Sequence, residues 1–159
     1  MGDLELVVSL SREFNEIDRH PYNEERVRRG LLPLLEDDQV GVVYVDDPPP
    51  EGYAVVTWGY SLESGGRDAL LDEIYTRRRG EGRGGLLLEE VMADLTRRGL
   101  PRVFLETEAH NQAVRRFYAR HGFVEEDSIW MARDLLLPGG GEAGAVGRST
   151  PRGEGGTSP

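Results

Sequence analysis

A glycine-rich loop between a predicted strand and a predicted helix constrains this chain most. The loop reads RGEGRGG over residues 79–85, after the β-rich run Ala69–Thr76 and before the amphipathic segment Leu86–Arg98. Glycine permits positive φ and close approach, so the backbone N–H groups of such a loop can converge at the positive end of the helix dipole. The sequence therefore predicts a cradle for a small anion, with a flexible connector as the alternative.

Two familiar phosphate-binding loops fit this segment poorly. A nucleoside-triphosphate loop requires lysine followed by serine or threonine, and the chain contains no lysine. A dinucleotide fingerprint follows the first strand of a parallel βαβ unit and needs an acidic residue, which Glu106 could mimic. Here three strands joined by hairpins precede the loop. A nucleotide-binding module is therefore only a minor alternative.

The hydrophobic pattern predicts helices and strands over most of the chain. Apolar residues at three- and four-residue steps indicate helices, and β-branched or aromatic runs between turn residues indicate strands. We expect helices at Leu4–Ile17, from the cap Asn23 to Leu35, at Leu86–Arg98 and at Ala113–Arg120. We expect strands at Val40–Val45, Tyr53–Tyr60, Ala69–Thr76 and Arg102–Thr107, and a last hairpin of Phe123–Glu126 and Ile129–Leu135. The short hairpin connections predict an antiparallel sheet.

The end of the chain differs in composition from the rest. Residues 138–159 carry 8 of the 21 glycines and 3 of the 9 prolines, with almost no large apolar side chain. Such a segment cannot bury enough apolar surface to offset the entropy cost of folding. We expect one domain over residues 1–137 and a disordered tail over residues 138–159.

Charge is distributed unevenly along the chain, whose formal net charge is −10. Residues 1–76 hold 17 acidic residues and 6 arginines, whereas residues 77–137 hold 10 and 11. An acidic first half favours a sub-site for a cation, with a solvated acidic face as the alternative. We expect no nucleic-acid partner, because dense basic charge occurs only around the glycine loop.

Composition also excludes several classes of chemistry. The chain has no cysteine, which excludes disulfides and thiolate zinc sites and agrees with a reducing compartment. His20, His110 and His121 lack metal-ligand spacing, so we expect no metal. No apolar run approaches the roughly 20 residues of a membrane helix. We expect a soluble, cytoplasmic protein with no membrane partner.

Two motifs together carry a resemblance to a known family. Arg79, Gly82 and Gly84 follow the pattern Arg or Gln, two residues, Gly, one residue, Gly, placed after a central strand. This pattern resembles the coenzyme A pyrophosphate loop of the GNAT superfamily of N-acetyltransferases. The segment NQAVRRFYARHGF, residues 111–123, is similar to the region that follows the fifth strand of that family. The resemblance covers about residues 3 to 135.

The resemblance implies the GNAT fold, acetyl-CoA as cofactor and a set of residues that would hold it. That fold is an α/β (α+β) fold with a mixed, mostly antiparallel sheet flanked by helices. The implied cofactor-binding residues are Ile74, Tyr75 and Thr76 beside the thioester, Arg79, Gly80, Glu81, Gly82, Arg83, Gly84 and Gly85 in the loop, and Asn111 and Tyr118. Helix capping is an equal alternative for Asn111.

Three departures from the family pattern stand out. The strand that precedes the family's first helix is not visible here, so we expect a sheet without its first strand. The link from Thr76 to Arg79 is shorter than is common. Arg83 occupies a position that is usually apolar, so we expect its side chain to be turned outward or strained. A non-catalytic acyl-CoA-binding protein of the same fold is therefore an alternative.

Acetyl transfer to an amine needs a base for the ammonium and an acid for the departing thiolate. Asp72 and Glu73 are the candidate bases, and as neighbours in a strand they face opposite sides, so only one points into a cleft. We favour Glu73, with an exposed strand carboxylate as the alternative for either. Tyr118 is the candidate acid, with aromatic packing beside Phe117 as its alternative.

The acidic first half favours a cationic acceptor. The stretch WGYSLESGGRDALLDEIYT resembles the branch of diamine and polyamine acetyltransferases, which favours a diamine, polyamine or aminoglycoside-like amine. Protein N-termini and lysine side chains are the alternative acceptors. The candidate acceptor-binding residues are Tyr22, Trp58, Tyr60, Glu63 and Asp68, although core packing or solvation would explain each of them. The family also implies a homodimer.

Overall fold

The computed structural model describes residues 2–18, 20–46, 48–133 and 135, and the chain divides into the units Met1–Glu125 and Glu126–Pro159. All helices and strands of the described residues lie in the first unit. The predicted end of the domain at residue 137 and the predicted tail over residues 138–159 fall outside the described residues. None of the described helices combines the length and the apolar character that a membrane crossing requires.

Two helices open the first unit, as predicted. α1 spans Gly2–Asp18 and α2 spans Glu24–Glu36. The side chain of Asn23 caps α2 by accepting a hydrogen bond from the Arg26 N–H at 2.9 Å, which satisfies one of the free amides of the first turn. Pro33 lies inside α2 without ending it.

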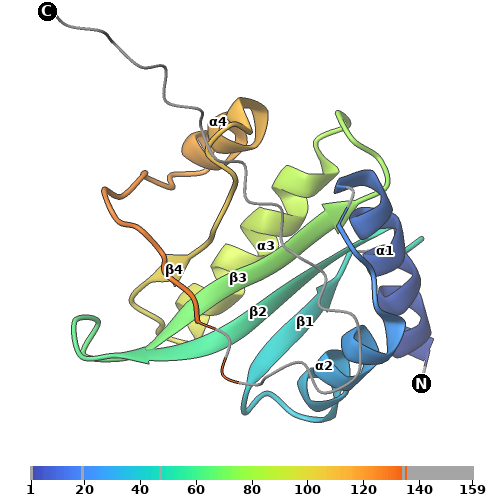
Figure 1. Cartoon of the computed structure of the whole chain (residues 1–159), viewed down its shortest axis with the longest axis horizontal. Helices are drawn as coiled ribbons and strands as arrows, with labels where there is room; N and C mark the ends of the chain where they lie inside the picture. Colours follow the sequence, from blue (N-terminus) through green and yellow to red (C-terminus); the bar gives the residue numbers. More distant parts are fainter. Residues whose placement is uncertain (1, 19, 47, 134, 136–159) are drawn as a thin grey trace, which may run out of the picture. The chain divides into compact units, whose positions relative to one another are not determined.

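The sheet contains four strands in the order β1-β2-β3-β4, side by side in Figure 1. β1 (Gly41–Val45), β2 (Gly52–Ser61) and β3 (Gly66–Thr76) pair antiparallel, and β4 (Val103–Phe104) pairs parallel with β3. α3 (Arg83–Arg97) connects β3 to β4, and α4 (Gln112–Arg120) follows β4. This confirms a mixed, mostly antiparallel sheet flanked by helices, in which β1 is an edge strand of the described residues.

The predicted last hairpin is wrong. The described residues between Phe123 and Leu135 form neither strand. Apolar side chains of this segment remain largely exposed, as Ile129 at 88% and Met131 at 92% illustrate. Alternation of side chains predicts a strand only where one face is buried, and this segment buries neither.

Each face of the sheet buries its own apolar cluster. Ala54 and Val56 of β2 point to the face covered by α3, where Leu87, Leu88, Val91 and Leu95 are buried. Their neighbours Tyr53 and Val55 point to the other face, where α1 and α2 supply Val7, Val8, Leu10 and Leu31. This is the ordinary alternation of side chains along a strand, and it places two separate cores on the two sides of β2.

A β-bulge changes that alternation in β3. Val55 pairs with Glu73 and Val56 pairs with Leu71, so Asp72 is an extra residue without a partner in β2. In a regular strand, Leu71 and Glu73 would share a face. The bulge instead leaves Leu71 in the cluster under α3 and turns Glu73 toward Tyr53 on the α1 and α2 face.

Candidate functional site

The glycine loop leads directly into the first turn of α3. Gly80 and Gly82 have φ of 85° and 78°, which L side chains rarely adopt, so both positions need glycine. Gly82 is the N-cap of α3, and no side chain caps the helix there. The N–H groups of a first helical turn have no partner within the helix, and the helix dipole favours an anion beside them. The loop therefore has the backbone geometry of the small-anion cradle that the sequence predicts.

Three of the four arginines around this loop are paired with carboxylates from other elements. Arg77 binds Glu13 of α1 at 2.8 and 2.6 Å. Arg78 pairs with Glu51, in the connection between β1 and β2. Among the described residues no carboxylate pairs with Arg79, whose guanidinium lies over the Tyr75 ring at 5.9 Å. Arg79 is therefore the loop arginine best able to meet an anion.

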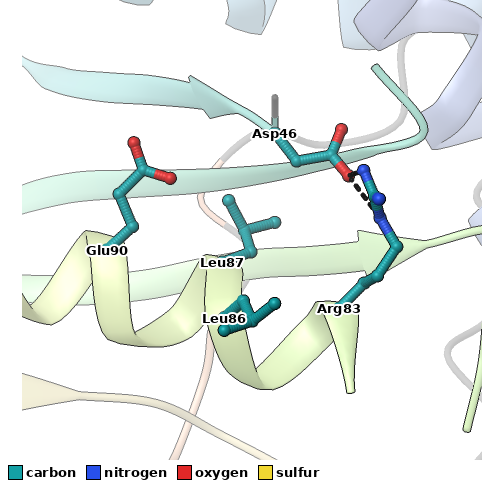
Figure 2. A pocket seen from close by; sticks show the side chains of 5 residues that line it. All are labelled: Asp46, Arg83, Leu86, Leu87 and Glu90. Atoms are coloured by element: carbon teal, nitrogen blue, oxygen red, sulfur yellow. Dashed lines mark hydrogen bonds and ion pairs between the residues drawn. The ribbon is translucent and has the colours of Figure 1, made fainter. Parts of the chain in front are cut away.

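Arg83 is the third paired arginine, and it is half-buried. Its guanidinium points at the Asp46 carboxylate, with Nη2 to Oδ2 at 3.2 Å (Figure 2). The other oxygen of Asp46 accepts the N–H groups of Glu51 and Gly52, at 2.7 and 2.8 Å. Leu86, Leu87 and Glu90 of α3 complete this small pocket. This half-buried ion pair ties α3 to the end of β1.

Glu73 lies in a mostly buried polar group on the α1 and α2 face. Its Oε2 accepts a hydrogen bond from the Tyr53 hydroxyl at 2.6 Å, and Tyr53 is fully buried. Burial raises the pKa of the Glu73 carboxyl, the bond from Tyr53 lowers it and the charge of Asp72 raises it, for a net increase. Ser11, 1% exposed, lies beside Tyr53, and its hydroxyl has no hydrogen-bond partner among the described residues. This arrangement holds a carboxylate that binds a proton more readily than usual.

Asp72, the other candidate base, differs from Glu73. It is the bulged residue and its side chain is exposed, although desolvation raises its pKa as well. No hydrogen bond or ion pair of its carboxylate occurs among the described residues. Only Glu73 of the two is held in position by a neighbouring side chain.

Tyr118 and Asn111 lie on or next to α4. Tyr118 packs edge-on against Phe117 and Phe123, at centroid distances of 5.2 and 5.5 Å. Burial raises the pKa of Tyr118 to about 12, so its hydroxyl stays protonated at neutral pH. The side-chain oxygen of Asn111 caps α4 by accepting a hydrogen bond from the Val114 N–H at 3.3 Å. This bond does not use the N–H donors of the Asn111 side chain.

The structure separates the predicted acceptor residues into two groups. Tyr22 lies between α1 and α2, where its hydroxyl donates to the Val8 carbonyl at 3.2 Å. The other four residues lie toward the turn between β2 and β3, at the far end of β3 from Glu73. Trp58 donates to the Asp38 carbonyl, Tyr60 is 80% exposed, Glu63 pairs with Arg102, and Asp68 accepts from Ser64. Five residues of strand, about 17 Å, separate Asp68 from Glu73.

Three residues that shape this site were not among the candidates predicted from the sequence. Tyr53 holds Glu73, Glu13 holds Arg77, and Asp46 holds Arg83. A tyrosine directly before the apolar residues Ala54, Val55 and Val56 is a weak signal for a buried hydroxyl that needs a partner. The two acids carry no such signal, because their partners lie 64 and 37 positions away.

Several solved structures share this fold. A proposed acetyltransferase from Arthrobacter superposes with a TM-score of 0.73 at 27% identity, covering 84% of this chain and 91% of that one. An integron cassette protein from the mobile metagenome of Cole Harbour Salt Marsh gives 0.74 at 26% identity, covering 86% and 88%. An aminoglycoside acetyltransferase from an uncultured soil sample gives 0.68 at 17% identity, covering 85% and 91%, and shows the fold alone. No curated protein matches the sequence.

The family comparison covers most of the first unit. The model of the acetyltransferase (GNAT) family matches residues 6–123, which include α1 from residue 6 onward, the sheet, the glycine loop and α4. The match therefore contains both the loop at the start of α3 and the carboxylates of β3. This chain belongs to the acetyltransferase (GNAT) family.

Proposed function

We propose that this protein transfers the acetyl group of acetyl-CoA to a small cationic amine, by direct attack of the amine in a ternary complex. The loop of Arg79–Gly85 at the start of α3, in a chain of this family, is the observation that carries the proposal. Family membership supports acetyl transfer as the reaction. The cofactor and the kind of amine are our inference from the charges and the geometry.

The residues present fit coenzyme A. The free amides of the first turn of α3 and the guanidinium of Arg79 would hold the pyrophosphate. The end of β3, from Ile74 to Thr76, and the side chains of Asn111 and Tyr118 would line the arm of the cofactor. Acetyl-CoA would supply the acetyl group as a thioester.

Two side chains of this chain would move protons. Glu73 has a raised pKa and is held by Tyr53, so it is suited to take a proton from the ammonium of the acceptor, directly or through a water. Tyr118 stays protonated at neutral pH, so its hydroxyl could give a proton to the departing thiolate. Glu73 is half-buried and pairs with no arginine among the described residues, so its carboxylate would also attract a cationic amine to this point.

The acidic residues of the first half favour a cationic acceptor. Tyr22 lies on the same face as Glu73 and would contact a small amine. Trp58, Tyr60, Glu63 and Asp68 would meet only an acceptor long enough to reach the turn between β2 and β3, such as a polyamine or an aminoglycoside-like amine. Protein N-termini and lysine side chains remain the second candidate class, because the same carboxylates would serve them. For assembly, we propose a homodimer, which the unpaired edge of β1 would allow.

Calorimetric titration with acetyl-CoA, with ATP as control ligand, tests the cofactor site. We expect micromolar binding of acetyl-CoA alone. Gly82→Asp should abolish it, because a side chain at φ 78° is strained and its charge would face the pyrophosphate. Gly99→Asp is the matched control, because Gly99 has φ 76° and follows the other end of α3. Equal binding by the Gly82 variant and the wild type would overturn the loop assignment.

A further inference from the structure

Tyr53 and Glu73 meet only because of the bulge at Asp72. Tyr53 pairs in register with Tyr75, and Val55 pairs with Glu73, so all four of these residues lie on the α1 and α2 face. The extra residue puts Glu73 on this face and brings its carboxylate within 2.6 Å of the Tyr53 hydroxyl. The β-bulge in β3 therefore makes the hydrogen bond between Tyr53 and Glu73 possible.

Among the described groups near Glu73, only Tyr53 donates a hydrogen bond to its carboxylate. On β3 itself the neighbouring groups are Asp72, which bears the same charge, and Tyr75, whose hydroxyl contacts Glu13 at 3.5 Å. From α1, Ser11 is neutral, and Glu13 is already bound by Arg77. Tyr22, before α2, donates to a backbone carbonyl. No arginine pairs with Glu73 in the part of the chain that the structure describes.

We propose that Tyr53 is a positioning residue for acetyl transfer, which orients the Glu73 carboxylate and tunes its readiness to accept the proton of the amine. This rests on the proposed function, in which Glu73 is the base. Tyr53 does not touch the acceptor in this scheme. Its fully buried hydroxyl keeps its proton, because burial and the adjacent charge of Glu73 raise its pKa. It therefore acts as a permanent donor to one oxygen of Glu73 and leaves the other oxygen for the ammonium.

Tyr53→Phe separates positioning from packing, because it removes one hydroxyl and keeps the ring. Loss of the hydrogen bond should raise the pKa of Glu73, since that bond lowers it. The acid limb of the kcat/KM profile should move to higher pH, with kcat/KM about tenfold lower at pH values below the limb. Asp72→Asn should move the limb the opposite way, because the charge of Asp72 raises the same pKa.

Tyr44→Phe is the matched control. Tyr44 on β1 donates to Asp94 of α3 at 2.8 Å, which is the same kind of bond on the other face of the sheet. This variant should lose a similar contact and leave the acid limb in place. Equal limbs in wild type, Tyr53→Phe and Tyr44→Phe would overturn the proposal, as would equal shifts in the two tyrosine variants.

Carbon NMR of the unmodified chain provides a readout that needs neither activity nor a stable variant. The ring carbon that bears the Tyr53 hydroxyl should follow the titration of the Glu73 carboxyl, and the same carbon of Tyr44 should stay constant over that pH range. A Tyr53 signal that ignores this titration would overturn the proposal. If the Tyr53 signal follows the Glu73 titration but the acid limb of Tyr53→Phe is unshifted, the two side chains are paired and Glu73 is not the base. That result would overturn the proposed role of Glu73 in catalysis.

Discussion

The two faces of the sheet each bear a tyrosine that donates to a carboxylate, and the two carboxylates differ in their other partners. Asp94 accepts from Tyr44, Arg97 and Arg98, at 2.8, 2.9 and 2.7 Å. Burial raises its pKa, but these bonds outweigh burial and the net pKa is lowered. Glu73 accepts from Tyr53 alone among the described residues, and burial keeps its pKa raised. Asp94, which also binds two arginines, is therefore held as a charged carboxylate. Glu73, which binds only a tyrosine among the described residues, accepts a proton more readily.

Turnover should separate the two carboxylates most strongly. Glu73→Gln should lower kcat by about 100-fold or more, since it removes a general base while keeping the shape of the side chain. Asp94→Asn should change kcat by less than about threefold, because Asp94 lies on the face away from Glu73. Release of free thiol from acetyl-CoA, followed with a thiol reagent, measures both. A wild-type rate in Glu73→Gln would move the base to Asp72 or to solvent.

The free energy of unfolding should separate the two tyrosines by a smaller margin. Tyr53→Phe should cost about 2 kcal/mol, because it leaves a mostly buried carboxylate without its donor. Tyr44→Phe should cost about 1 kcal/mol, because Asp94 keeps its two arginines. Urea denaturation of each variant measures these values. Equal costs would mean that the arginines do not compensate at Asp94.

The pH dependence of stability should have opposite signs for the two carboxylates. The pKa of Glu73 is raised in the folded state, so its contribution to stability falls as pH rises from 4.5 toward the folded pKa. The pKa of Asp94 is lowered, so its contribution is present above 3.8 and is lost as pH falls through the folded pKa. Relative to wild type, Glu73→Gln should therefore gain stability as pH rises above 4.5, and Asp94→Asn should gain below 3.8. Curves of equal sign would contradict the comparison.

Local patterns allowed the helices and the four strands to be predicted from the sequence, although β4 is shorter than the predicted Arg102–Thr107. Asn23 indicated the start of α2, and the glycines at 80 and 82 indicated the loop before α3, because caps and positive φ depend on single residues. The pairing of Tyr53 with Glu73 could not be predicted. It depends on the bulge at Asp72, which exists only through the register of β3 against β2.

Contacts between residues far apart in the chain also could not be predicted from the sequence. Arg83 was expected to be turned outward or strained, and its actual partner, Asp46, lies at the end of β1. The last hairpin was predicted from two short runs between Phe123 and Leu135, and these runs do not form strands because most of their side chains are exposed. The sequence pattern of a segment shows which of its side chains could be buried. Whether they are buried depends on the elements that pack against the segment in the folded protein.

The most direct test of the proposed activity is incubation of the whole chain with acetyl-CoA and one amine at a time. The amines would be a linear polyamine, an aminoglycoside and a peptide with a free N-terminus. We predict release of free thiol with the polyamine or the aminoglycoside, together with the gain of one acetyl group by that amine in mass spectrometry. Release with the peptide alone would assign a protein acceptor. Binding of acetyl-CoA without thiol release from any amine would contradict catalysis and favour a protein that only binds the cofactor.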